Sequence, residues 1–414
     1  AEKDLDSYSV AMVEYVRRIP DGHVKLTGPF EDLTEQFIGG SYGLGLAELD
    51  DGSIVVAAIK PEGPAAKAGL RQGARIVTWN GVSIENALVA ADTRWFKNAA
   101  TKEDLALLRL QALTRSPVGR QAVVEFIAAP AEDRPNEDET LAKEPPGTLT
   151  ATMTARSDNF ADIALFDLAP IPTMEELLKN VEWRIMDGNI GYLRIYHVIH
   201  FDDYAQYPTE VTEIVAQALE AFNAAGVNSL ILDLRGNRGG SDQAAADISG
   251  HFAKESSIYE RTAWYNASSG RFDYAHSDLF GQTFELGDEP LWVEPRQPHF
   301  WGNIAVLVNP ATISSGEGLA MAIGRQPNAT VMGFYGTHGS FGLVFWPIAM
   351  PEGISFQFPI GRSLDAHGVI QIDSDASGMG GVQPEIRIPR TWQNIAAYAS
   401  GKDVELEFAR DWLL

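Results

Sequence analysis

The stretch SLILDLRGNRGGSDQAAADISG, residues 229–250, joins an apolar run to an alanine-rich run through a loop with three glycines. The apolar run is typical of a strand buried on both faces, and the alanine-rich run favours a helix. Asp233 and Arg235 at the strand end are expected to brace the loop by an ion pair. Gly239 and Gly240 let a backbone N–H approach a ligand closely, because no Cβ intervenes.

The same strand-to-helix order recurs on both sides of this stretch. Residues 189–199 and 303–310 have strand patterns, and residues 211–227 and 316–324 have helical patterns. Alternating strands and helices predict an α/β layered fold with a mostly parallel sheet. Ligand sites in such folds collect at the carboxyl ends of the strands, where the loop after Asp233 is expected to lie.

A second strand end, NPATISSGE at residues 309–317, carries a pair of serines just before a helical pattern. A hydroxyl at this turn would face the open end of the sheet, with helix N–H groups available to stabilise an oxyanion. The alternative interpretation is that Ser314 and Ser315 are ordinary helix N-cap residues. A serine nucleophile also needs a base beside it, and no lysine lies between Lys254 and Lys402.

Composition excludes several classes of function. The formal net charge of −24 disfavours binding to nucleic acid and to anionic membrane surfaces. The absence of cysteine excludes disulfides, thiolate catalysis and cysteine-ligated zinc. No metal-binding or cofactor motif stands out, so we expect neither a metal nor a cofactor. No apolar run reaches the roughly 20 residues needed to cross a bilayer. Because the chain lacks cysteine and begins with Ala1, we expect an exported protein, periplasmic or extracellular, rather than a cytoplasmic one.

The length of 414 residues predicts more than one domain. We expect an N-terminal helical segment over residues 1–36, a small mainly-β unit over residues 37–128, an acidic and proline-rich linker over residues 129–148, and the α/β core over residues 149–414.

Taken together, these motifs resemble peptidase family S41, which includes the C-terminal processing proteases and the tricorn core protease. LILDLRGNRGG at 230–240 is similar to the family's Asp-Leu-Arg-x-Asn-x-Gly-Gly loop. In the nucleophile segment of the family, the serine stands three residues before a glutamate. Glu317 is that glutamate here, so the resemblance selects Ser314. It also implies a ClpP/crotonase-like layered core and oxyanion donors from the N–H groups of Gly239 or Gly240 and of Ser315.

The unit at 37–128 resembles a PDZ domain. SYGLGLAEL at 41–49 matches its peptide-carboxylate loop, and GPAAKAGLRQGARIVTWNG at 63–81 matches its later helix and strand. This likeness implies that the loop could bind the C-terminal carboxylate of a peptide and add the peptide as a strand. The five loop residues implied are Tyr42, Gly43, Leu44, Gly45 and Leu46. The alternative is a module that stabilises or gates the core without binding free C-termini.

The sequence differs from the processing proteases in the residue that could act as the base. In those proteases, a lysine about 25 residues after the serine deprotonates the serine. That position is Gly339 here. The tricorn-like branch instead has a histidine near the N-terminus, and RIPDGHVKL at 18–26 is similar to that motif, which makes His23 the candidate. Imidazole suits the task because its ordinary pKa lies near neutrality. His338, close to the position of the missing lysine, is the rival.

The acid that orients the base stays open at this stage. GVQPEI at 381–386 resembles the closing motif of the family, with Glu385 in place of aspartate. Asp373 and Asp375 are further candidates, and Asp21 either orients His23 or shapes its turn.

The sequence therefore predicts a serine peptidase that cleaves unstructured polypeptides or peptides through an acyl-enzyme. Homo-oligomerisation is left open. The alternatives are a non-catalytic protein that binds peptide or lipid on the same fold, and an acyl hydrolase acting on a non-peptide ester or amide.

Overall fold

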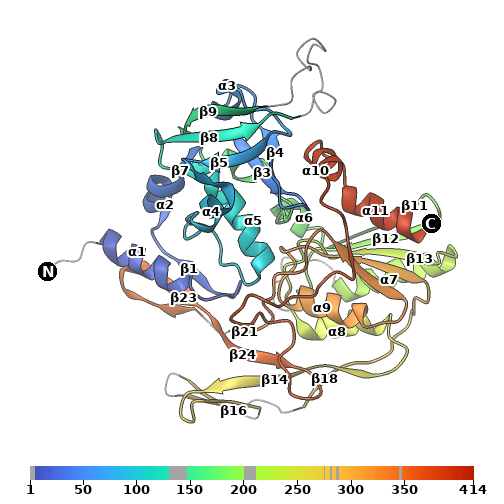
Figure 1. Ribbon diagram of the computed structural model, residues 1–414. Coiled ribbons are helices and arrows are strands. Elements are labelled where there is room, and N and C mark those ends of the chain that lie inside the picture. The colour runs from blue at the N-terminus through green and yellow to red at the C-terminus, as the bar shows by residue number, and fades with distance from the viewer. Residues whose placement is uncertain are drawn as a thin grey trace.

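The computed structural model describes residues 5–129, 147–199, 211–274, 276–279, 282–285, 289–344 and 347–414. Figure 1 shows a small, mainly-β unit packed on a larger α/β core, with the N-terminal helix α1 at the side of both. Most of the expected linker over 129–148 lies outside the described residues.

The core is built on a six-stranded sheet in the order β11-β12-β13-β19-β20-β25. Its strands are β11 (Val181–Met186), β12 (Ile190–Ile195), β13 (Ser229–Asp233), β19 (Asn303–Leu307), β20 (Ala329–Gly333) and β25 (Ile386–Arg387). Only β11 runs antiparallel to its neighbour, and the other four pairings are parallel. The expected α/β fold with a mostly parallel sheet is confirmed.

Helices cover both faces of this sheet, which gives the core three layers (Figure 1). Helices α7 (Val211–Ala224), α8 (Asp242–Gly250) and α9 (Ser315–Gly324) pack on one face through a large apolar cluster. Helix α11 (Val404–Leu413) packs on the other face against a smaller cluster. The strands β13 and β19 are therefore buried on both sides, as their continuous apolar sequences predict.

A second, antiparallel sheet of the core has the order β15-β14-β24-β21, with β18 pairing to β14. The remaining elements of the core are β14 (Ser257–Asn266), β15 (Arg271–Asp273), the hairpin β16 (His276–Leu279) and β17 (Gln282–Glu285), β18 (Leu291–Val293), β21 (Leu343–Val344), β22 (Ile348–Ala349), β23 (Ser355–Gln357), β24 (Pro359–Leu364), α6 (Met174–Leu177) and α10 (Trp392–Ala399).

The small unit is a six-stranded antiparallel sheet in the order β3-β4-β5-β8-β9, with β6 pairing to β5. It contains β3 (Leu44–Glu48), β4 (Ile54–Ile59), α3 (Pro64–Lys67), β5 (Arg75–Trp79), β6 (Val82–Ser83), α4 (Ile84–Val89), α5 (Lys102–Leu113), β8 (Gln121–Ile127) and β9 (Thr148–Thr154). Beside it, β2 (Gly40–Ser41) pairs with β7 (Arg115–Ser116) and with β10 (Arg156–Ser157).

The position of β9 differs from the expected domain boundary. All seven of its residues pair with β8, so the strand after residue 147 completes the sheet of the small unit rather than beginning the core. Alternate side chains Ala151 and Met153 are buried in the cluster of the small unit. The expected boundary at residue 149 therefore falls inside a strand of the small unit.

The N-terminal segment joins the two units. Helix α1 (Leu5–Val16) and helix α2 (Glu31–Ile38) flank the short strand β1 (Lys25–Thr27), which pairs antiparallel with β23 of the core. This pairing holds the segment that contains His23 against the core.

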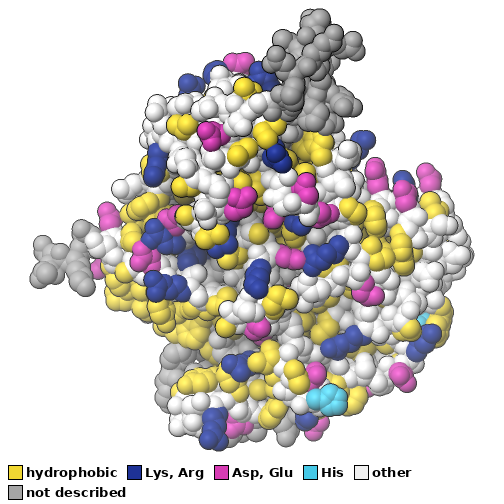
Figure 2. Space-filling model, viewed as in Figure 1, with side chains coloured by type: hydrophobic (Ala, Val, Ile, Leu, Met, Phe, Trp, Pro, Cys, Tyr) yellow, Lys and Arg dark blue, Asp and Glu magenta, His cyan; other side chains and the backbone are white. Residues whose placement is uncertain are grey.

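Figure 2 shows the same face of the molecule, on which basic and acidic side chains are interspersed among hydrophobic ones. Within the described residues, no helix is long and apolar enough to cross a membrane.

Candidate active site

Ser314 occupies a sharp turn between β19 and α9. It has a φ of +62°, which non-glycine residues rarely adopt, and its N–H donates to the Ser340 carbonyl at 2.9 Å. Ser314 is half-buried, whereas Ser315 is only 1% exposed and its hydroxyl donates to the Gly240 carbonyl at 3.1 Å. Of the two serines, only Ser314 therefore keeps a hydroxyl available to a substrate.

The glycine loop after β13 lies directly against this turn, because β13 and β19 are adjacent parallel strands. The bonds that join the two loops include Thr312 Oγ1 to the Leu234 carbonyl (2.8 Å), and the N–H groups of Gly236 to Asn309 Oδ1 (2.9 Å) and of Ile313 to the Asn237 carbonyl (3.0 Å).

Gly239 and Gly240 approach the serine turn closely. Gly239 has a φ of +71°, and a Cβ there would lie 2.6 Å from the Ser314 Cβ and 2.9 Å from the Ser315 nitrogen. The Gly239 N–H already donates to Asn237 Oδ1 at 2.9 Å, which removes it from the expected oxyanion donors. Among the hydrogen bonds of the described residues, the N–H groups of Gly240 and Ser315 have no acceptor.

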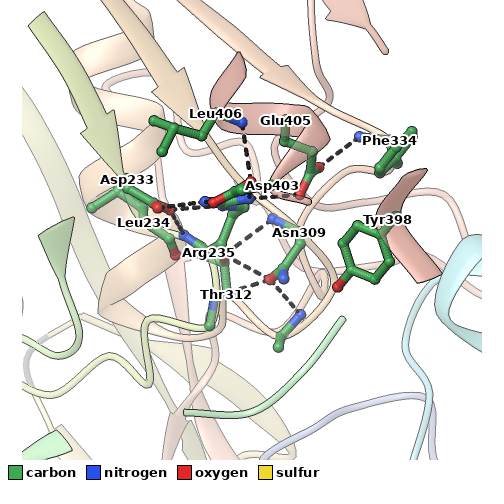
Figure 3. Close-up of polar contacts among 12 residues, drawn as sticks. Asp233, Leu234, Arg235, Asn309, Thr312, Phe334, Tyr398, Asp403, Glu405 and Leu406 are labelled. Atoms are coloured by element: carbon green, nitrogen blue, oxygen red, sulfur yellow. Dashed lines mark hydrogen bonds and ion pairs between the residues drawn. The ribbon is translucent and has the colours of Figure 1, made fainter. Parts of the chain in front are cut away.

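Arg235 braces the glycine loop, as the sequence predicts (Figure 3). Its guanidinium donates to both oxygens of Asp233 (2.9 and 2.7 Å), to both oxygens of Asp403 (2.7 and 2.8 Å) and to Glu405 (3.0 Å). Burial opposes ionisation of Asp233, but Arg235 holds its pKa below the usual value. Asp403 and Glu405 belong to the start of α11, so this network ties the loop to the helix on the far face of the sheet.

His23 lies in the N-terminal segment next to the serine turn. The Gly22 N–H donates to Ser340 Oγ at 2.8 Å, and a Cβ on Gly22 would clash with the side chains of His338 and Ile313. The imidazole is 12% exposed, and its Nδ1 lies 3.2 Å from Asp21 Oδ1. Asp21 also accepts the His23 N–H at 2.7 Å, so it both shapes the turn and stands beside the ring.

His338 is enclosed. It is 3% exposed, with Nδ1 2.9 Å from Ser340 Oγ and Nε2 3.3 Å from Asp104 Oδ2. Burial lowers the pKa of His338 to about 4. Both ring nitrogens face protein groups, an arrangement that does not favour a role as proton acceptor.

The three candidate acids have different surroundings. Asp373 Oδ1 accepts the Phe341 N–H at 2.6 Å, and burial raises the pKa of its carboxyl to about 6, with the charge of Asp21 raising it further and His23 lowering it. Asp375 closes an exposed turn with Ser377 and Met379. Glu385 is exposed at the sheet edge, where its N–H donates to the Val331 carbonyl. Of these three acids, only Asp373 has a pKa affected by the charge of His23, and that charge also affects Asp242 at the start of α8.

Two groups of acids near the turn were not assigned a role from the sequence. Glu317, fully buried on α9, accepts the N–H groups of Gly339 (2.8 Å) and Ser340 (2.9 Å) as well as the Thr337 hydroxyl, and burial raises its pKa to about 8. Asp242 at the start of α8 and Glu260 on β14 form a close pair, and burial raises the pKa of both carboxyls. In the sequence, Asp242 has only the pattern of an acidic residue in a first helical turn.

The loop expected to bind a peptide carboxylate is buried. Tyr42 N–H donates to the Thr114 carbonyl (3.1 Å), Gly43 N–H donates to Ser41 Oγ (2.9 Å), and residues 44–46 pair with β4. The carboxylate of Asp162 stands beside this loop, 2.7 Å from Lys60 Nζ and 2.9 Å from Ser41 Oγ.

No group of three or more acidic or histidine side chains among the described residues has metal-binding geometry.

Two family models match the sequence. Residues 189–388 match peptidase family S41, and residues 32–101 match the PDZ domain. Among curated proteins, no sequence matches this chain significantly.

Solved structures of CPAF have a fold similar to that of this chain. Mature CPAF complexed with lactacystin is 14% identical, with a TM-score of 0.60 over 97% of this chain and 86% of that chain. The cpaf s499a mutant is 13% identical, with a TM-score of 0.60 over 99% and 89%. The photosystem II D1 C-terminal processing protease is 18% identical over 98% and 88%, with a TM-score of 0.36. At these identities, the CPAF structures establish a shared fold.

Proposed function

Since this chain is a serine-type peptidase of family S41 with a PDZ domain, and acts on peptides or polypeptides, we propose that Ser314 is its nucleophile and His23 its general base. The oxyanion donors are then the N–H groups of Gly240 and Ser315. Asp373 and Asp21, rather than Glu385, are the acids whose negative charge stabilises the protonated ring of His23.

The contacts of Ser340 carry this pairing. Its carbonyl accepts the Ser314 N–H at 2.9 Å, and its hydroxyl accepts the N–H of Gly22, the residue before His23, at 2.8 Å. One residue thus bonds to the turn of the nucleophile and to the segment of the base, although Ser314 and His23 are 291 positions apart (314 − 23) in the sequence. His338 bonds to the same hydroxyl but is fully enclosed, so His23 fits the role of base better.

The reaction follows from these positions. Ser314 Oγ attacks the carbonyl carbon of the substrate peptide bond while its proton passes to His23 Nε2. The carbonyl oxygen becomes an oxyanion, which the two free N–H groups stabilise. The tetrahedral intermediate collapses as His23 returns the proton to the leaving amine, which leaves an acyl-enzyme on Ser314. Water, deprotonated by His23, then releases the carboxylic acid and restores the serine.

The Asp21 carboxylate beside Nδ1 fits this proton path. A carboxylate 3.2 Å from Nδ1 favours the tautomer with its hydrogen on that nitrogen, which leaves Nε2 as the proton acceptor. Asp373 adds a second negative charge near the ring, which stabilises the imidazolium formed in the first step.

Unstructured polypeptide is the proposed substrate class. Ser314 is half-buried, and helix α5 of the small unit contacts two loops of the core, since the Lys102 N–H donates to the Gly378 carbonyl and the Gly336 N–H donates to Glu103. A peptide bond reaches such a site in an extended, unpaired segment.

The test is the cleavage of a reduced, unfolded polypeptide by the wild type and three variants. Ser314→Ala and His23→Gln are expected to lower kcat at least about 1,000-fold and to leave the melting temperature unchanged. Ser315→Ala is the matched control, because it removes a buried hydroxyl of the same chemistry, and it is expected to retain far more activity than Ser314→Ala. If Ser314→Ala cleaves the polypeptide at the wild-type rate, Ser314 is not the nucleophile.

A further inference from the structure

The 336–340 loop contacts both the Ser314 turn and the His23 segment, and its contact with the His23 segment depends on the hydroxyl of Ser340. Ser340 is 0% exposed, and its Oγ accepts the Gly22 N–H at 2.8 Å. The same Oγ lies 2.9 Å from His338 Nδ1. A serine hydroxyl carries one hydrogen and two lone pairs, so an oxygen that accepts the Gly22 N–H can still either donate to His338 Nδ1 or accept from it.

The surroundings of the His338 ring decide between these two directions. To accept the Ser340 hydrogen, Nδ1 must be unprotonated, so the neutral ring carries its hydrogen on Nε2. Burial of His338, at 3% exposure, disfavours the charged ring in the same direction. The Nε2 side faces Asp104 Oδ2 at 3.3 Å, and a carboxylate at that nitrogen favours the same tautomer.

Asp104 comes from the small unit, just after the residues that match the PDZ domain. It lies in the first turn of α5, where it is 1% exposed, and its other oxygen lies 2.8 Å from Lys97 Nζ. The neighbouring Glu103 accepts the Gly336 N–H at 2.8 Å. The first turn of α5 therefore contacts the start and the middle of the 336–340 loop. The charged and titratable groups that affect His338 are Asp104, Lys97, Asp21 and His23.

We propose that Asp104, His338 and Ser340 are positioning residues, which hold the His23 segment and the Ser314 turn in reacting geometry from the first turn of helix α5. Hydrogen bonds run from Ser340 Oγ to His338 Nδ1 and from Gly22 N–H to Ser340 Oγ, and the Asp104 carboxylate lies 3.3 Å from His338 Nε2 as its charge partner. None of the three side chains exchanges a proton with substrate. The small unit thereby forms part of the active-site scaffold. This inference rests on the proposed roles of Ser314 and His23.

The test measures kcat and KM on an internally quenched peptide, with kcat normalised to the sites that a fluorophosphonate titrates. Ser340→Ala and His338→Leu are expected to lower kcat about 10- to 100-fold, as a small displacement of reacting groups does, with KM changed less than about threefold. The conservative variants should restore most of the rate. Ser340→Thr keeps the hydroxyl, and His338→Asn places an acceptor at the position of Nδ1. Asp104→Leu is expected to lower kcat in the same way, and non-additively with His338→Leu.

Ser374→Ala is the matched control. Its buried hydroxyl has no hydrogen-bond partner among the described residues, and its N–H donates to the Gly339 carbonyl of the same loop. Its normalised kcat is expected to equal that of the wild type. A merely structural role for Ser340 and His338 would lower the number of titrated sites and leave the normalised kcat unchanged.

The outcomes separate this inference from the proposed function. Full normalised activity of both Ser340→Ala and His338→Leu, with Ser314→Ala inactive, overturns the positioning role alone. If His338→Asn loses as much activity as Ser314→Ala while Ser340→Ala is unaffected, His338 is the proton acceptor. This result also overturns the positioning role. Activity retained by Ser314→Ala overturns the proposed function itself.

Discussion

Replacing Arg235 with methionine is expected to destabilise the core strongly, because it removes the guanidinium that bonds to both Asp233 and Glu405 in the network of Figure 3. The side chains of these two acids are 0% and 2% exposed. Asp403 is 42% exposed and can regain water, so it contributes little to the loss.

The size of the loss in unfolding free energy depends on the hydrogen bonds that each buried acid keeps in the variant. Asp233 retains the hydroxyl of Tyr192 at 2.9 Å, and Glu405 retains the N–H of Phe334 at 3.0 Å. Neither neutral donor replaces a full charge, and removing one partner of a buried ion pair costs about 3–5 kcal/mol of unfolding free energy. The matched control is Arg410→Met, whose ion pair with Asp411 is exposed, and which is expected to cost less than about 1 kcal/mol.

The loss should also depend on pH. In the wild type, Arg235 holds the pKa of Asp233 below its unfolded value, so the ion pair contributes stability above that value and loses it as pH falls. Without the cation, burial raises the pKa of Asp233, and the acid takes up a proton on folding. The difference between Arg235→Met and wild type is therefore larger at pH 8 than at pH 5.

Urea denaturation at the two pH values, followed by tryptophan fluorescence, measures this difference. Two results would refute the argument that the buried network braces the glycine loop. One is a loss of unfolding free energy in Arg235→Met at pH 8 that is no greater than the loss in Arg410→Met. The other is a loss that does not become smaller at pH 5.

Three further predictions concern the site. Gly239→Ala places a Cβ 2.6 Å from the Ser314 Cβ at a φ of +71°, so kcat/KM for an unfolded polypeptide should fall at least about 100-fold, and near-wild-type kinetics would contradict this packing. Asp373→Asn should lower kcat about 10- to 100-fold at pH 8 in the same assay, whereas Glu385→Gln should leave it unchanged; the reverse order would restore Glu385 as the acid. Burial raises the pKa of Glu260 to about 8, so the wild type should lose stability as pH rises from about 4.5 to 8. Glu260→Gln should flatten this part of the profile of melting temperature against pH. An unchanged slope would contradict the buried state of the acid.

The arrangement of the sheet and the meeting of its two loops could be predicted from the sequence, because both depend on local patterns. Continuous apolar runs followed by glycines or by serines mark the ends of β13 and β19, and adjacent parallel strands bring such ends together. The ion pair between Asp233 and Arg235 was likewise predictable, since the two residues are two positions apart at a strand end.

The surroundings of the base could not be predicted in this way, since they depend on contacts between distant segments. Gly22 and Ser340 are 318 positions apart, and Asp104 reaches His338 from another domain. Spacing can suggest that a histidine stands near the nucleophile, but it does not reveal that both nitrogens of His338 are engaged. The occupied Gly239 N–H was missed for a similar reason, because the side chain of Asn237 folds back on its own loop.

The most direct test of the account is the site of covalent modification by a fluorophosphonate, mapped by peptide mass spectrometry after intact-mass measurement. We expect the wild type to carry a single adduct on Ser314, Ser314→Ala to carry none, and His23→Gln to react at least about 100-fold more slowly. An adduct on Ser315, or polypeptide cleavage that continues at the wild-type rate after Ser314 has been fully modified, would contradict the assignment of Ser314 as the nucleophile.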